Sequence, residues 1–502
     1  MLTPNDFEKI ARQAKKLYSE LELEIIKEIA ERIANVGYAN TVVLNDIKIT
    51  QEMGIMYQDI INLVAKYNEA SVSQIQSIFD TAGAQTLKLD DKIYREAGLT
   101  PLPLKQSPSM IQLLSATAKK THNNLSNLVM TTATSAQTEF YSAMNKAYME
   151  VSTGVKSYSE AILDSVKAIG DKGAYITYPS GQHRSIESAV RMNVLTSVNQ
   201  TCGKLQELRA DEMGWDLMEL TAHSGARPEH AEWQGKIVSR SGQRGYLSLD
   251  DIGYGEVTGF KGVNCRHDWM PYYKGSTRTY TNQELNELKN EKVNYNGKNI
   301  SKYEATQIQR RMERQIRNDK KEIAGLEGIL KSNTTDNKLI EDTKTNFAKK
   351  TLIYKAHESQ LSEFLRQTNL KQDNIRLTTS VYNKKISAQV SNIIKIANKY
   401  NKSDIIGTTV NGVKITQISE HIISRTYARK LKFEDVEDAL KNPLDYGKIN
   451  TDKLGRRSFK VIGEKVTVYV NPDTGKTTTT HATHTKTAEK LKKKNEANKQ
   501  TN

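Results

Sequence analysis

The spacing of apolar residues over the first 200 positions predicts long amphipathic helices. Thr3, Pro4 and Asp6 form a pattern typical of a helix start, and the apolar residues after them recur every three or four positions: Phe7, Ile10, Ala14, Leu17, Leu21, Ile25 and Ile29. Further helices are expected over residues 51–68, 71–81, 109–125, 133–153, 158–168 and 185–212. Pro101 and Pro103 predict a loop between two bundles. Residues 1–215 are therefore expected to form a helical body.

The helical spacing returns in residues 276–370, which are expected to form an antiparallel helical hairpin. The apolar positions of its first helix form a heptad-like series among many charged side chains: Ile308, Met312, Ile316, Ile323, Leu326 and Leu330. Residues 333–337 interrupt the series, and a second helix is expected to reach about residue 365. The basic side chains of the first helix fit either a solvated exterior or a contact with DNA. Residues 371–407 are expected to be a linker.

Near residue 408 the apolar pattern changes to a period of two. Thr467 and Tyr469 alternate with three valines between two turn-forming stretches, and a Thr-rich run follows, which predicts three consecutive antiparallel strands. Helices are expected over residues 418–429 and 433–440. Residues 408–487 are therefore expected to form a small α+β domain, followed by a basic disordered tail over 488–502. The predicted fold class is mainly α and multidomain.

Composition sets outer limits on the function. A chain of 502 residues exceeds what one hydrophobic core usually organises, and no apolar run approaches the roughly 20 residues of a membrane span. The N-terminus carries charged residues where a signal peptide would be apolar. Two cysteines exclude a disulfide framework and fit a reducing cytoplasm. The net charge of +15, of which residues 405–502 hold +8, predicts a polyanionic partner, either nucleic acid or an acidic protein.

Candidate chemistry is concentrated in an irregular segment over residues 216–275, which holds three histidines, one of the two cysteines and a cluster of glycines. Gly225 and Pro228 prevent a regular helix there, so a loop could turn the imidazoles inward. Four residues are candidate ligands for a structural zinc ion: His223, His230, Cys265 and His267. Packing without a metal explains the same residues, since Cys is often simply buried and His often bonds to backbone carbonyls.

The same segment carries a paired signature. Residues 223–236 read H-x-G-x-R-P-x-H-x-x-W-Q-G-K, and residues 264–267 read N-C-R-H. In order and spacing they resemble the minor capsid proteins of tailed bacteriophages, relatives of the Mu F-like head morphogenesis proteins, over roughly residues 1–370. The resemblance implies a virion structural protein, present in several copies and assembled in the bacterial cytoplasm at or near the portal of the head. It implies portal and other head proteins as partners, with phage DNA as a further one.

A second resemblance covers about 80 residues of the C-terminal domain. Residues 419–429, 435–443 and 468–475, with the Thr-rich strand, are similar to phage-borne nuclease domains grouped with barnase, EndoU, colicin-type tRNases and RelE. That similarity implies a metal-independent, toxin-like ribonuclease that needs no cofactor and acts on host RNA such as tRNA.

Such cleavage needs a base, an acid and a cation that stabilises the phosphorane. The candidate site residues are His421 as base or acid, Arg425 and Arg429 on phosphate, and Thr479 and His481 at the end of the last strand. Two alternatives remain. The domain could bind nucleic acid without cutting it, or each of these side chains could have a structural role.

Overall fold

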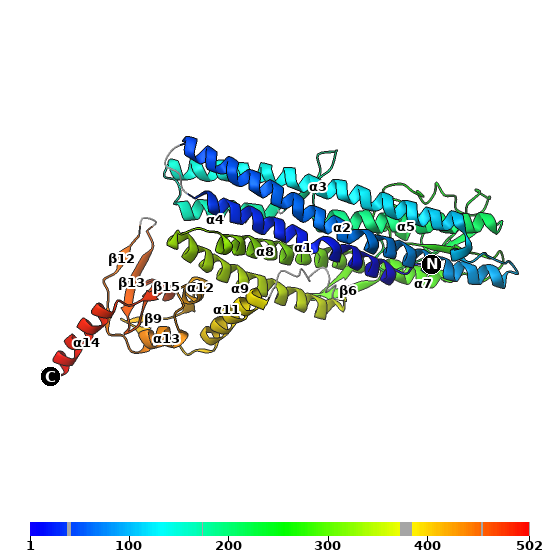
Figure 1. Cartoon of the computed structure of the whole chain (residues 1–502). Helices are drawn as coiled ribbons and strands as arrows, with labels where there is room; N and C mark the ends of the chain where they lie inside the picture. The colour runs from blue at the N-terminus through cyan, green and yellow to red at the C-terminus, as the bar shows by residue number, and fades with distance from the viewer. Residues whose placement is uncertain (38–41, 173, 372–383, 453–454, 501–502) are drawn as a thin grey trace.

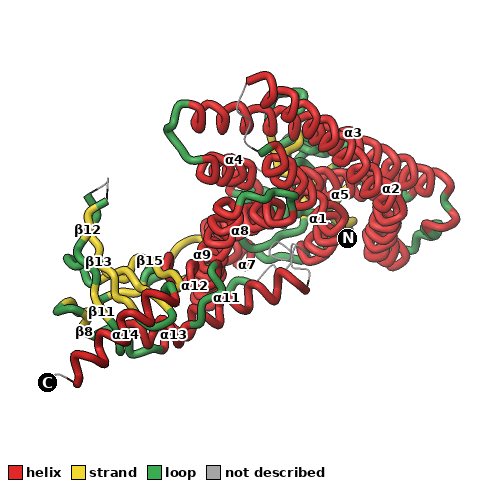
Figure 2. Tube along the Cα trace, turned by 60° about the vertical axis from the view of Figure 1, so that its left-hand side comes forward, coloured by secondary structure: helices red, strands yellow, loops and turns green. Residues whose placement is uncertain are grey.

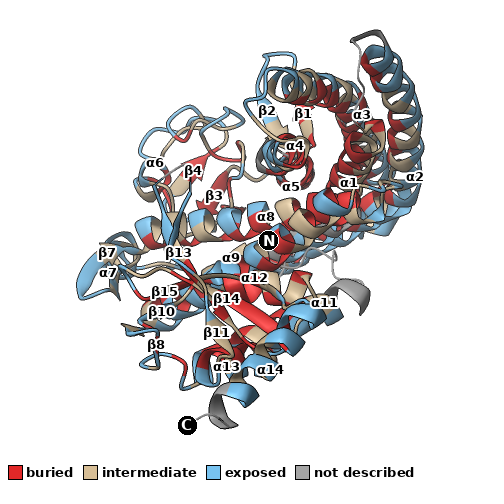
Figure 3. Cartoon of the chain, turned by 90° about the vertical axis from the view of Figure 1, so that its left-hand side faces the viewer, coloured by how far each residue is buried: buried red, intermediate tan, exposed pale blue. Residues whose placement is uncertain are grey.

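The computed structural model describes residues 1–37, 42–172, 174–371, 384–452 and 455–500, and it is mainly α-helical. The helical body is confirmed. Long helices lie lengthwise against one another, with buried side chains on the faces between them (Figures 1 and 3): α1 Pro4–Val36, α2 Val42–Glu96, α3 Pro108–Ser152, α4 Tyr158–Lys172 and α5 Ile186–Glu212. Thr3 caps α1 in a reciprocal capping box with Asp6, as the sequence pattern indicates.

Two of these helices are longer than predicted. α2 is continuous where the polar stretch near residue 70 predicted a break, and α3 is continuous across residues 126–132. Neither stretch contains glycine or proline, so nothing in the backbone forces the helix to end there. The loop with Pro101 and Pro103 lies between α2 and α3, which pack on each other in one bundle rather than in two.

The segment between α5 and α7 (Asn282–Asn290) is not wholly irregular. It contains a three-stranded antiparallel sheet in the order β4-β3-β5 and a short helix, α6: β3 Leu217–Leu220, α6 Pro228–Ala231, β4 Ile237–Ser239 and β5 Trp269–Pro271. A small core of its own holds the loops together, and it includes Trp233, Phe260, Cys265 and Trp269. A separate two-stranded hairpin, β1 Tyr175–Thr177 with β2 His183–Ser185, leads into α5.

The helical hairpin is confirmed as α8 Lys302–Lys331 and α9 Asn337–Thr368, preceded by α7 and a β-hairpin, β6 Lys292–Tyr295 and β7 Lys298–Ser301. It packs directly on the helical body. α8 lies against α1 and α4, and the buried ion pair between Lys321 and Glu22 measures 2.6 Å. One hydrophobic core therefore runs through the body and the hairpin.

The C-terminal unit lies at one end of the bundle, against α9 (Figures 1 and 2). The three predicted antiparallel strands are confirmed as β13 Arg457–Ile462, β14 Val466–Val470 and β15 Lys476–Ala482. The predicted helices are present as α12 Glu420–Ala428 and α13 Phe433–Lys441. Short strands complete the unit: β8 Thr409–Val410, β9 Val413–Lys414, β10 Gln417–Ile418, β11 Asp445–Tyr446 and β12 Asn450–Thr451. β10 pairs in parallel with β15, and the unit has its own apolar core.

Two segments of this region contain helices that the sequence did not predict. Within the expected linker over 371–407, α11 spans Lys384–Lys402, and its apolar side chains enter both cores, Ile393 that of the bundle and Tyr400 that of the C-terminal unit. Residues 372–383 of that linker lie outside the described residues. The expected disordered tail is instead largely helical, as α14 Thr485–Gln500, because its residues include no helix breaker and Ala488 is buried against the unit.

Candidate functional site

Three of the four candidate metal ligands converge in the segment between α5 and α7. The ligand atoms of His230, Cys265 and His267 lie within 4.8 Å of one another, and all three side chains are buried. The two Nδ1 atoms are 3.2 Å apart, and Cys265 Sγ lies 3.9 Å from that of His230 and 3.8 Å from that of His267. α6 positions the first histidine, and the loop that leads into β5 positions the other two residues.

The outer nitrogens of both histidines are held by oxygen acceptors. His230 Nε2 lies 2.7 Å from the carbonyl oxygen of Thr258, and His267 Nε2 lies 3.1 Å from Gln234 Oε1. The Gln234 atom is fixed as oxygen because it also accepts the backbone N–H of His223. Since these oxygens can only accept, each Nε2 carries the proton and each Nδ1 presents a lone pair to the other.

Burial strengthens this arrangement. It lowers the pKa of His230, and it lowers the pKa of His267 well below the usual value, with the neighbouring histidines adding to the effect. Both rings are therefore neutral near pH 7. The thiol of Cys265, whose pKa burial raises, could donate to only one of the two facing lone pairs.

The spacing of the three atoms fits zinc. A tetrahedral ion with Zn–N bonds of about 2.0 Å and Zn–S bonds of about 2.3 Å separates two nitrogens by about 3.3 Å, and a nitrogen from a sulfur by about 3.5 Å. The observed separations of 3.2, 3.8 and 3.9 Å are close to those edges. The two Nε2 contacts are the outer hydrogen bonds that metal-binding histidines usually make.

His223, the fourth expected ligand, lies beside the cluster without joining it. Its ring stacks on that of His267, with centroids 4.4 Å apart, while its Nδ1 lies 3.0 Å from the carbonyl oxygen of Ser224. Burial lowers its pKa to about 4. Its Nε2 is buried and has no hydrogen-bond partner among the residues that the structure describes. To complete a four-ligand set, this ring would have to move, or water would have to take the fourth position.

Two charged residues of this segment were not predicted as functional from the sequence. Lys261 and Asp268 form a fully buried ion pair of 2.6 Å, and the same Lys261 ammonium donates to Asn199 on α5 at 2.9 Å. Asp268 also accepts the backbone N–H of Leu2, which ties the start of α1 to the segment. Burial raises the pKa of Asp268, but Lys261 outweighs it, so the pKa lies below the usual value. Their position close to the N-C-R-H stretch over residues 264–267 was the available signal.

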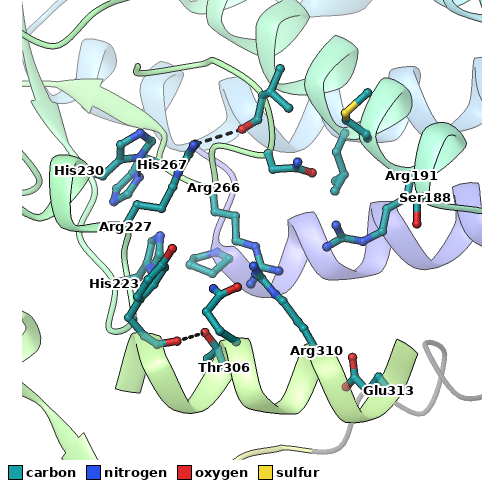
Figure 4. A pocket seen from close by; sticks show the side chains of 18 of the residues that line it. Ser188, Arg191, His223, Arg227, His230, Arg266, His267, Thr306, Arg310 and Glu313 are labelled. Atoms are coloured by element: carbon teal, nitrogen blue, oxygen red, sulfur yellow. Dashed lines mark hydrogen bonds between the residues drawn. The ribbon is translucent and has the colours of Figure 1, made fainter. Parts of the chain in front are cut away.

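A cavity of about 570 Å³ opens beside the histidines. Its walls come from the start of α5, the segment between α5 and α7, and α8, and Figure 4 shows Arg191, Arg266 and Arg310 pointing into it from these three parts. Arg227 also lines it and donates to the carbonyl oxygen of Val263 at 3.0 Å. No local sequence pattern indicated this gathering of arginines, because they are spread over residues 191–310 of the chain.

The candidate nuclease residues lie at the other end of the bundle, in the C-terminal unit (Figure 1). His421 and Arg425 lie on α12, where Arg425 Nε is 3.4 Å from His421 Nε2, and Arg429 is the C-cap residue of this helix. Thr479 and His481 are on β15, and the His481 ring lies 5.5 Å from that of Tyr469. Arg429 connects the two elements, because it donates to the carbonyl oxygen of Thr480.

Both guanidinium groups of α12 are engaged by carboxylates of α9. Arg425 contacts Glu341 at 2.5 Å and Asp342 at 3.1 Å, and Arg429 contacts Glu341 at 2.8 Å. Burial, followed by the charge of Arg425, lowers the pKa of His421, and burial followed by Arg429 lowers that of His481. The arginines expected to hold phosphate therefore hold the C-terminal unit against the hairpin in this structure.

Among the described residues, no helix is long and apolar enough to cross a membrane. The chain is 26% identical over 336 residues to a protein named "Structural protein" of Lactococcus phage LL-H, an alignment that covers 63% of this chain and 85% of the relative. No solved structure matches this chain. The family model for phage minor capsid protein 2 matches residues 2–366, which include the helical body, the segment with the His/Cys cluster, and nearly all of the hairpin. The chain therefore belongs to the phage minor capsid protein 2 family.

Proposed function

We propose that this minor capsid protein is a structural component of the phage head, present in several copies at or near the portal. The observation that carries the proposal is the family match over residues 2–366, because it coincides with the continuous core of bundle and hairpin. The outer faces of the two longest helices supply apolar contact surface for portal and other head proteins. Their exposed large side chains are Leu44, Ile47, Ile55 and Val72 on α2, and Ile111, Met130, Tyr141 and Met149 on α3.

Mass spectrometry of purified, nuclease-treated particles tests this role. Peptides from the chain are expected, and cross-linking should join Lys119 and Lys120, both exposed on α3, to portal or neighbouring head proteins. Particles that contain no peptide of this chain would contradict a virion location, and cross-links confined to distal shell proteins would contradict a place near the portal.

We also propose that His230, Cys265 and His267 hold a structural zinc ion. Two facing lone pairs beside a thiol are electrostatically unfavourable when empty, and a cation between them removes the repulsion. A bound ion would cross-link α6 to the loop before β5 and so stabilise the segment between α5 and α7, called the signature segment below. No catalytic role follows from this site.

Elemental analysis of protein prepared without chelator tests the zinc proposal. About one zinc per chain is expected, and Cys265→Ser should lose it. Cys202→Ser is the matched control, because Cys202 is also buried but lies on α5 outside the cluster. Less than about 0.1 zinc per chain in the unaltered protein, or equal loss in both variants, would contradict the site.

We propose metal-independent RNA cleavage by the C-terminal unit as a second function. It is supported by a separate apolar core and by α12, which carries His421 and Arg425 and is capped by Arg429, beside β15. In this proposal a histidine moves the proton of the 2′-hydroxyl and an arginine holds the phosphate. The carboxylates of Glu341 and Asp342 compete with RNA for these arginines.

The full chain incubated with tRNA in EDTA tests cleavage. Products ending in a 2′,3′-cyclic phosphate are expected, and His421→Ala should slow cleavage by about 10²–10⁴-fold. His183→Ala in the exposed β1–β2 hairpin is the control. Glu341→Gln combined with Asp342→Asn should raise the rate. Cleavage that needs a divalent metal, or that survives His421→Ala unchanged, would leave nucleic-acid binding without cleavage as the alternative for this unit.

A further inference from the structure

The cavity beside the His/Cys cluster has a strong excess of positive charge. Its lining contains two acidic residues, Glu187 and Glu313, and seven arginines: Arg184, Arg191, Arg227, Arg266, Arg310, Arg314 and Arg317. Arg317 lies 3.5 Å from Glu187, so these two residues of the lining form an ion pair. The lining thus holds five more cations than anions with its histidines neutral, and it includes no lysine among the described residues.

The kind of cation indicates the kind of ligand. The guanidinium group is planar and offers two parallel N–H donors, a geometry that matches an oxyanion such as phosphate, whereas the lysine ammonium is a point charge. A concave wall also concentrates the field of its charges more than a flat surface does. Arg191, Arg266 and Arg310 reach the same space from three separate parts of the chain, so the charge is assembled by the fold (Figure 4).

The volume of the cavity favours an organic ligand over a small ion. At about 570 Å³ it is within the range of about 300–1,000 Å³ that is typical of pockets for organic ligands. The side chains of Met192, Leu195 and Tyr303 give part of the wall an apolar or aromatic character. Such a wall suits an organic group attached to the phosphate better than it suits a phosphate alone.

We propose that this cavity binds a phosphate ester of nucleotide size, either a free nucleotide or one or two units of a nucleic acid strand. The phosphates occupy the space between the arginines of α5, the signature segment and α8, and the organic part lies against the apolar wall. The site is separate from the C-terminal unit, which lies at the opposite end of the bundle (Figure 1).

Isothermal titration of the full chain with ATP, with tripolyphosphate and with an oligothymidylate of eight units tests the proposal. The comparison also distinguishes a free nucleotide from a nucleic acid strand as the ligand. Binding by ATP or by the oligonucleotide is expected, with tripolyphosphate weaker than ATP. Arg310→Gln should weaken binding about tenfold, because a charge-assisted hydrogen bond to phosphate is lost. Arg311→Gln is the matched control, since it makes the same change on the next residue of α8, which is exposed and outside the lining.

A thermal melt of each variant shows whether it folds, and Arg191→Gln on α5 replaces Arg310→Gln if that variant does not. Several outcomes would overturn the proposal. One is equal weakening by Arg310→Gln and Arg311→Gln, and another is no binding of any of the three probes. A peptide of consecutive glutamates that binds more tightly than every phosphate probe would also overturn it, and would assign the cavity to an acidic protein partner.

Discussion

At the scale of single residues, the signature segment combines a small apolar core with buried polar side chains that contact one another. His230, Cys265 and His267 were predictable because the sequence places their chemistry in one segment. The ion pair of Lys261 with Asp268 was not, because it depends on how the loop before β5 folds back against α5. His223 was predicted in the ligand set, yet its hydrogen bond with Ser224 turns the ring into a stack instead.

Lys261→Met should destabilise the signature segment by about 3–5 kcal/mol, because it leaves Asp268 buried without its counter-charge. Tryptophan fluorescence during urea unfolding measures this locally, since Trp215, Trp233 and Trp269 all belong to or contact the small core of this segment. Lys289→Met removes an exposed pair with Glu232 and should leave the midpoint unchanged. An equally small effect of Lys261→Met would show that the buried pair is dispensable.

His223 should make the segment sensitive to acid. Its folded pKa of about 4 lies below the value of 6.5 expected when unfolded, so the unfolded chain binds the proton more readily. The stabilisation is therefore complete above about pH 6.5 and is lost as the pH falls towards 4, by about 2–3 kcal/mol.

The test compares the midpoints of urea unfolding at pH 7.5 and at pH 5, both in EDTA. Tryptophan fluorescence again reports the unfolding. His223→Gln should reduce the difference between the two midpoints. If the variant shows the full difference, another group is responsible for the acid sensitivity.

At the scale of secondary structure, periodicity predicted where helices lie but not where they end. α2 and α3 continue through the predicted breaks, and both pack against neighbouring helices of the bundle. α11 was missed although its buried residues recur at steps of three and four: Val390, Ile393, Ala397 and Tyr400. That spacing was a usable signal, but the many lysines and asparagines around it favoured the prediction of a linker.

Close helix packing gives a prediction at this scale. A Cβ atom added at Gly328 of α8 would lie 2.4 Å from the backbone oxygen of Lys27 on α1. Gly328→Ala should therefore destabilise the bundle by about 1–3 kcal/mol, despite the better helix propensity of alanine. Gly54→Ala on α2 meets nothing within 4 Å and should stabilise by about 0.5–1 kcal/mol. Thermal unfolding of both variants measures the contrast, and a Gly328→Ala protein as stable as Gly54→Ala would contradict the close approach.

At the scale of the whole molecule, α9 is shared by two parts of the chain. One side packs on α8 within the bundle, and another receives α12 of the C-terminal unit. The family match ends at residue 366, close to the end of this helix, so the C-terminal unit lies beyond it. No pattern in the sequence predicted that Glu341 and Asp342 would meet Arg425 and Arg429, because ion pairs between distant segments have no local signature.

Reversing this charge should loosen the contact. Glu341→Lys combined with Asp342→Lys places cations beside Arg425 and Arg429, and limited proteolysis should then release the C-terminal unit several times faster. Glu363→Lys is the control, because the partners of Glu363 among the described residues, Arg366 and Gln367, lie on α9 itself. Equal proteolysis rates for the two proteins would show that apolar packing alone holds the unit in place.

The position of α1 has a consequence for synthesis on the ribosome. Leu2 bonds to Asp268 across 266 residues, and the apolar face of α1 is completed by α8, beginning at Lys302. At about 5–20 residues per second, translation needs on the order of tens of seconds to deliver these partners. Throughout that interval, part of the apolar face of α1 stays uncovered after the helix has left the ribosome. The nascent chain therefore depends on α2, the next long helix made, to shield α1 from other chains until the hairpin arrives.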